Sequence, residues 1–103
     1  MAEHRVSYEV TAIVRADLVD DYESYMRRHI PEVLATGKFL SASFSRSAGG
    51  CFRARYEAAD QESLDRYLAE DTARLRADFA EHFPAGVELS REVWEIVEVW
   101  LPA

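Results

Sequence analysis

The 103-residue chain has one cysteine, four glycines and three prolines, and it contains no long hydrophobic run. Because Cys51 has no second cysteine to pair with, an intrachain disulfide is excluded, and three scattered histidines give no metal-ligand spacing. No apolar stretch reaches the length of a membrane span, and the N-terminus lacks the basic-then-apolar pattern of a signal segment. No glycine-rich phosphate-binding motif is present either. These absences predict a cytoplasmic protein with no membrane partner, no metal and no cofactor.

Acidic side chains outnumber basic ones, 19 against 12, which gives a formal net charge of −7. Nucleic acids and anionic membranes attract concentrated basic patches, so this balance argues against both as the main partner. All the basic residues except Lys38 are arginine, a side chain suited to recognition of carboxylate or phosphate. The length is that of one domain, and we expect residues 1–103 to fold as a single unit.

The segment from residue 5 to residue 15 organises the predicted fold. Val6, Tyr8 and Val10 alternate with Ser7 and Glu9, and the alternation continues along the segment, which is typical of a strand with one buried face. We expect six elements in order: a strand at 5–15, a helix at 17–34, strands at 39–46 and 51–58, a helix at 60–83 and a strand at 87–101.

Local signals set the ends of the predicted helices. Asp17 and Asp60 are expected to be N-caps, because an aspartate side chain accepts hydrogen bonds from the free amides of the first turn. Pro31 has no amide donor and is expected to kink or break the first helix near Ile30. Gly37 supplies the C-terminal stop of that helix.

The two middle strands form a predicted hairpin. Leu40, Ala42 and Phe44 are expected to face the core from its first arm. Gly49 and Gly50 are expected to form the turn, because paired glycines adopt positive φ at low cost.

The last predicted strand changes character along its length. Its first half alternates, but residues 93–101 are apolar on both sides. Because the chain has no further helix to cover the second side, a partner subunit is the simplest cover, and we expect a homodimer. The interface candidates are Trp94, Ile96 and Trp100, since large apolar and aromatic residues anchor interfaces.

The order strand, helix, strand, strand, helix, strand predicts an α+β fold, the ferredoxin-like βαββαβ sandwich. Its four-stranded antiparallel sheet has the strand order 4-1-3-2 and carries two helices on one face. Two such sheets that meet through their open faces form the dimeric α/β barrel. A helix-mediated dimer is the alternative.

Long stretches of the chain resemble a bacterial protein family. The segments HIPEVLATGKF and SLDRYLAEDTARLRADF, at residues 29–39 and 63–79, are the most specific, and the similarity covers nearly the whole chain. They resemble the small bacterial family catalogued as domain of unknown function 4286. The resemblance implies a ferredoxin-like fold of the dimeric α/β-barrel type, without an established activity or assigned catalytic residues. Related barrel families include cofactor-independent monooxygenases and degradative enzymes, an analogy at the level of fold.

Polar side chains gather on the open face of the predicted sheet. The candidates for ligand binding there are Glu9, Thr11, Ser41, Ser43, Arg53 and Arg55. If two subunits close over them, the two arginines favour a carboxylate or another small anion. The alternative is structural, with the arginines paired to glutamates on neighbouring strands.

His29 is a further candidate, because it lies on the buried face of the first helix with Glu32 three residues on. A histidine oriented by a carboxylate is a typical general base, although Pro31 disturbs the geometry between the two. The alternative is a histidine at the edge of the core, favoured by the helix dipole. Cys51 is either a nucleophile or, without an adjacent histidine, an ordinary free thiol.

Three functional hypotheses stay open. The first is a homodimer that binds a small anionic or aromatic molecule or acts as an interaction module, without catalysis. The second is a cofactor-independent enzyme of monooxygenase or isomerase type, acting on an aromatic or polyketide-like substrate between sheet and helices with His29, Arg53 or Arg55. The third is a ligand-sensing domain, which would need a separate DNA-binding partner.

Overall fold

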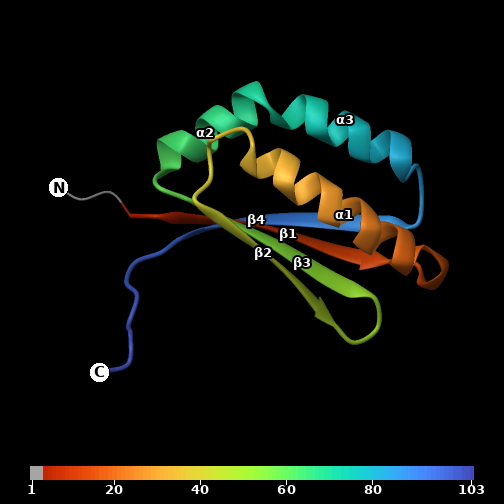
Figure 1. Ribbon diagram of the computed structural model, residues 1–103, viewed down its shortest axis with the longest axis horizontal. Coiled ribbons are helices and arrows are strands. Elements are labelled where there is room, and N and C mark those ends of the chain that lie inside the picture. Colours follow the sequence, from red (N-terminus) through yellow and green to blue (C-terminus); the bar gives the residue numbers. More distant parts are fainter. Residues whose placement is uncertain (1–3) are drawn as a thin grey trace.

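A computed structural model describes residues 4–103. Its elements are β1 (Val6–Val14), a 3₁₀ turn η1 (Ala16–Leu18), α1 (Val19–Leu34), β2 (Ser41–Ser47), β3 (Cys51–Ala58), α2 (Gln61–Glu70), α3 (Thr72–His82) and β4 (Val87–Glu95). All strand pairs are antiparallel, in the order β2-β3-β1-β4, and the helices cover one face of the sheet (Figure 1). The predicted ferredoxin-like fold and its strand order 4-1-3-2 are therefore confirmed. None of the helices within residues 4–103 is long and apolar enough to cross a membrane.

The core lies between the central strands and the helices. Alternate residues of β1 and β3 face the helices and are buried: Val6, Tyr8, Ala12, Val14, Phe52, Ala54, Tyr56 and Ala58. The register places Ala54 opposite Val10 and Tyr56 opposite Tyr8, so one row of side chains crosses both strands on the same face. The alternation in the sequence thus assigns the core face of the two central strands.

The first helix differs from the prediction at both ends. Asp17 lies in the 3₁₀ turn and binds Arg15, with 2.6 Å between its Oδ1 and the arginine Nε, so it does not cap α1. The helix also runs through Pro31 to its end at Leu34 instead of breaking near Ile30. Only one turn follows the proline, and the burial of Val33 holds that turn against the core. The lost hydrogen bond is therefore tolerated.

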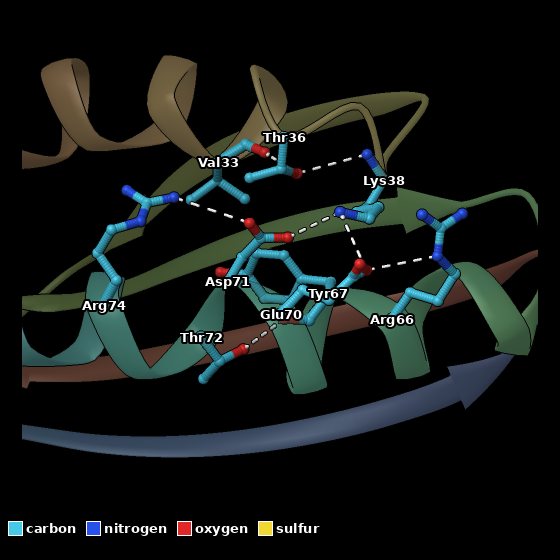
Figure 2. A network of polar contacts seen from close by, with 9 residues as sticks. All are labelled: Val33, Thr36, Lys38, Arg66, Tyr67, Glu70, Asp71, Thr72 and Arg74. Carbon is cyan, nitrogen blue, oxygen red and sulfur yellow. Dashed lines mark hydrogen bonds and ion pairs between the residues drawn. The ribbon is translucent and has the colours of Figure 1, made fainter.

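The second predicted helix is two helices. Asp60 caps α2 as expected, accepting a hydrogen bond of 2.8 Å from the Ser63 amide. At Asp71 the chain changes direction and α3 begins. Figure 2 shows the polar contacts around this junction: the Lys38 ammonium lies 2.9 Å from Asp71 and 3.5 Å from Glu70. The Thr72 hydroxyl donates to the Tyr67 carbonyl, so a polar network spanning two segments of the chain stabilises the break.

The predicted hairpin turn is confirmed. Gly49 and Gly50 both have positive φ, at 80° and 76°. A Cβ on Gly50 would lie 2.8 Å from the Val14 carbonyl oxygen, because the Gly50 carbonyl accepts the Val14 amide at 2.9 Å. Gly50 is therefore required both by its backbone conformation and by close contact with the end of β1.

One core assignment in the hairpin is wrong. Leu40 was expected to face the core, but its side chain is 56% exposed, and Phe39 is buried in its place. Leu40 precedes the first residue of β2, so the alternation of the strand does not extend to it. Phe39 instead packs edge-on against Tyr67, with ring centroids 4.8 Å apart.

The last strand is shorter than predicted. β4 ends at Glu95 because its partner β1 begins at Val6, and the Ile96 amide makes a final hydrogen bond to the Arg5 carbonyl at 2.8 Å. Residues 96–103 continue without helix or strand and run away from the helices (Figure 1). In this tail Trp100 and Leu101 are 78% and 83% exposed, so no part of the described chain covers these two side chains.

Aromatic side chains fill much of the core. Tyr22 lies among Phe44, Phe52, Phe79 and Phe83, with ring centroids 5.1–6.3 Å away. All five tyrosines of the chain are at most 5% exposed. The protein therefore buries every phenol that it has.

Burial makes these phenols sensitive to high pH. It raises the pKa of Tyr22, Tyr25 and Tyr56 far above the ordinary value of 10, and that of Tyr67 to about 12. The folded state favours the protonated phenol, so this stabilisation is intact below pH 10 and is lost as pH rises from 10 through 12. We expect tyrosinate absorbance and loss of circular dichroism to appear together in an alkaline titration. Gradual ionisation without unfolding would contradict the burial of the phenols.

Candidate functional site

Two hollows, one on each side of the sheet, contain residues that the sequence identifies as candidates. The first, here called the core cavity, lies between the sheet and the helices and has a volume of about 50 Å³. Its lining comes from α1, α3 and all the strands except β2, with one residue from α2: Tyr8, Val10, Tyr22, Met26, His29, Tyr56, Tyr67, Thr72, Leu75, Arg76, Phe79, Leu89 and Arg91. A volume of this size holds a few water molecules or one small chemical group.

His29 lines the core cavity and carries a buried ring nitrogen that has no hydrogen-bond partner. Nδ1 of His29 is buried, and among the buried side-chain nitrogens and oxygens of residues 4–103 it alone has no hydrogen-bond partner. Burial lowers the pKa of the imidazole, against the opposing fields of Glu32 and Asp78. The folded state therefore favours the neutral imidazole. This contribution to the free energy of unfolding is fully present above the unfolded pKa of about 6.5 and is lost as pH falls below that value. The imidazole is therefore neutral at pH 7 and able to donate or accept one hydrogen bond at Nδ1.

Neighbouring side chains fix the His29 ring. It stacks on Tyr25 with centroids 5.3 Å apart, and the Tyr25 hydroxyl donates to Asp78 at 2.7 Å. His82 packs against Tyr25 as well, at 4.9 Å. Glu32 is exposed and makes no hydrogen bond to Nδ1, so α1 does not form the carboxylate–histidine pair considered from the sequence.

On the open face, a nearly buried carboxylate anchors the polar residues. Glu9 is 9% exposed and lies 3.1 Å from Nε of Arg55 and 3.8 Å from Nε of Arg53. It also accepts a hydrogen bond of 3.1 Å from the Ser7 hydroxyl, and Arg53 donates to Thr11 at 3.4 Å. These contacts are the cross-strand ion pairs of the structural interpretation, and they engage Nε of both arginines.

A broader depression, here called the open-face hollow, lies beside these pairs and measures about 410 Å³. Its lining is Ser7, Glu9, Ser41, Ala42, Ser43, Arg55, Glu57, Trp94 and Ile96. Trp94 is 56% exposed there, opposite Ser7 on β1. The hollow combines a polar floor with an exposed indole, a surface on which either a ligand or a second subunit could rest.

The sheet separates the predicted site residues into two groups. Those chosen on the strands all point to the open face, where the register brings them close together: Glu9, Thr11, Ser41, Ser43, Arg53 and Arg55. His29 lies on the opposite side, among the helices. It therefore cannot act on the same small molecule as Arg53 or Arg55, which alternate along β3 with the buried Phe52 and Ala54.

Sequence reasoning missed two cationic residues of the core cavity, Arg76 and Arg91. Arg91 carries a signal in the sequence, because it interrupts the apolar alternation of Val87, Leu89 and Val93. Arg76 is hidden among the charged residues of a helix whose exposed side is also charged. Cys51 lies half-buried opposite Ile13 at one end of the open face. Residues 4–103 contain no group of three or more histidine, cysteine, aspartate or glutamate side chains placed to hold a metal ion.

A family model, described as Domain of unknown function (DUF4286), matches residues 5–97. No curated protein matches the chain. Among solved structures, SnoaB from Streptomyces nogalater, described as a cofactor-independent oxygenase, superposes with a TM-score of 0.74 and 14% identity over 93% of this chain and 96% of its own.

Two further solved structures share the fold. MupZ from Pseudomonas fluorescens has a TM-score of 0.70 and 14% identity, with coverage of 88% of this chain and 71% of its own. The NE2512 protein of unknown function from Nitrosomonas europaea has a TM-score of 0.71 and 15% identity, with coverage of 100% and 99%. At these identities the likeness establishes the fold alone.

Proposed function

The chain belongs to the family described as Domain of unknown function (DUF4286), and we propose that it is a homodimer that binds a small molecule in the core cavity. The observation that carries this proposal is the buried, unpartnered Nδ1 of His29. A buried polar atom without a partner costs about 1–3 kcal/mol, and because His29 lines a cavity, a ligand that enters there would supply the missing hydrogen bond.

Replacement of His29 by phenylalanine separates ligand binding from stability. Because His29→Phe keeps the ring stacked on Tyr25 and removes the unpartnered nitrogen, we expect its free energy of unfolding to equal that of the wild type or exceed it by about 1 kcal/mol. Affinity for the ligand should fall by about tenfold or more, since one hydrogen bond is lost. Urea unfolding and native mass spectrometry of freshly purified protein, which detects a retained ligand, measure the two effects.

His82→Phe is the matched control, because His82 contacts the same tyrosine but lies outside the cavity lining. It should retain the ligand as the wild type does. A His29→Phe variant that is less stable and retains the same ligand would show that the histidine is structural. Wild-type protein without extra mass in every preparation, and without affinity for added small acids or aromatics, would refute the binding function.

The proposed homodimer forms through the open faces of two sheets. Basic residues lie on one side of that face, Arg53 and Arg55 on β3, and acidic residues on the other, Glu88 and Glu92 on β4. A two-fold axis can set the basic side of one subunit against the acidic side of the next, so the surface is complementary to itself. The exposed indole of Trp94 and the uncovered apolar tail support the same pairing.

An enzymatic role is the second candidate, favoured by the likeness to SnoaB, which is described as a cofactor-independent oxygenase. Under this alternative the neutral His29 acts as a general base on the part of a substrate that enters the core cavity. Oxygen uptake by purified protein supplied with aromatic or polyketide-like compounds is the test. Uptake abolished in His29→Phe and retained in His82→Phe would establish an oxygenase, and binding without uptake would favour a binding protein.

A further inference from the structure

Arg91 occupies a position that the strand pattern reserves for an apolar side chain. On the helix-facing side of β4, the register sets Val87 opposite Val14 and Leu89 opposite Ala12. The next residue on that side is Arg91, which is opposite Val10 and lines the core cavity. Arg91 is exposed, so at residue 91 this row changes from apolar side chains to a charged one that borders both the cavity and solvent.

A second arginine meets the cavity from the helix layer. Arg76 shares one face of α3 with Thr72, Leu75 and Phe79, all of which line the core cavity. Its only hydrogen bond to residues 4–103 is a long one, 3.5 Å from Nη2 to the Tyr8 hydroxyl. Most of the donors of this guanidinium remain available.

Neither arginine has an acidic partner in the described chain. Acidic residues outnumber basic ones in this chain, and most of its arginines have a carboxylate nearby. Within residues 4–103, seven arginines lie within 4.0 Å of one: Arg5, Arg15, Arg46, Arg53, Arg55, Arg66 and Arg74. Arg76 and Arg91 form no such pair. The other two arginines without a carboxylate partner, Arg27 and Arg28 on α1, are exposed like Arg76 and Arg91, but they do not line the cavity.

We infer that the ligand of the core cavity is a small apolar carboxylic acid, whose carboxylate is held by Arg76 and Arg91 and whose body packs against Val10, Leu75 and Leu89. This inference rests on the proposed binding function and names its ligand class. Two guanidiniums from different elements form charge-assisted hydrogen bonds with one carboxylate, and the remaining wall is mostly apolar. The volume of about 50 Å³ limits the body to a short or branched chain.

Isovalerate and its neutral amide, isovaleramide, are a matched pair of probes for this site. We expect isovalerate to bind the wild-type protein about tenfold more tightly than isovaleramide, because only the acid pairs with the guanidiniums. Arg91→Met and Arg76→Met should each remove this preference by weakening isovalerate about tenfold while leaving isovaleramide unchanged. A titration followed by NMR of the Leu75, Leu89 and Val10 methyl groups measures the affinities and locates the probe.

Arg27→Met is the control, since Arg27 is an unpaired arginine outside the cavity, and it should bind both probes as the wild type does. Arg91→Met should also melt no lower than the wild type, because methionine completes the apolar row. Equal affinity for acid and amide would overturn the carboxylate assignment and leave the binding function standing. The carboxylate assignment would also be overturned if neither probe shifted the resonances of the cavity methyl groups. The same holds if inorganic phosphate competed for the site as well as isovalerate does. The binding function itself is judged by the ligand retained in native mass spectrometry.

Discussion

Trp94→Glu is expected to convert the proposed homodimer into monomers, with a dissociation constant raised by about 100-fold or more. A central tryptophan is the kind of residue whose loss costs an interface 2 kcal/mol or more, on the order of what hot spots contribute. Glutamate in place of the indole also puts a carboxylate into the apolar part of the interface, where it must lose water when the subunits associate. Light scattering coupled to size-exclusion chromatography over a dilution series measures the change.

Leu68→Glu is the matched control. Leu68 is a large apolar residue, 39% exposed, on α2 in the helix layer. A glutamate at this position should leave the dissociation constant of a dimer formed through the sheets unchanged. Dissociation by Leu68→Glu and not by Trp94→Glu would instead identify a helix-mediated dimer. A wild-type protein that is monomeric at every concentration would refute the homodimer altogether.

Phe52→Ala is expected to reduce the free energy of unfolding by about 3–5 kcal/mol, a large part of the stability of a domain of this size. Phe52 is 1% exposed and stacks on Phe44 with ring planes 9° apart, while Tyr22 lies 5.1 Å away. Removal of the ring leaves a cavity among aromatic groups that cannot close around an alanine. Urea unfolding at a fixed protein concentration measures the loss, because association in the proposed homodimer would make the free energy of unfolding depend on concentration.

Leu68→Ala provides the comparison, since it truncates a partly exposed side chain outside the aromatic cluster and should cost about 0.5 kcal/mol or less. A loss below about 1 kcal/mol for Phe52→Ala would mean that the aromatic cluster does not dominate the core.

The fold was predictable because apolar and polar residues alternate along its central strands, a pattern that can be read directly from the sequence. Alternation in β1 and β3 assigns the core face, and the order of elements then leaves the 4-1-3-2 sheet as the natural packing. Two departures come from tertiary contacts that a local pattern does not contain. Val33 holds the last turn of α1 to the core despite Pro31, and Lys38 stabilises the break before α3 from 33 residues away.

The site was less predictable than the fold. Alternation correctly put Glu9, Arg53 and Arg55 on one face, but sequence alone did not reveal that the sheet lies between them and His29. The core cavity joins residues of α1, α3 and β4, and their convergence depends on how the helices cross the sheet. Only Arg91 marks that convergence in the sequence, as a charge within an apolar row.

The distribution of aromatic residues has a practical consequence for fluorescence. Both tryptophans lie outside the core, Trp94 on the open face and Trp100 in the tail, whereas every tyrosine is buried. Emission excited selectively from the indoles therefore reports the surroundings of the open face and of the tail, while energy transfer from the phenols to the indoles depends on an intact core. A single sample thus reports the surroundings of the indoles and the folding of the core through two separate sets of chromophores.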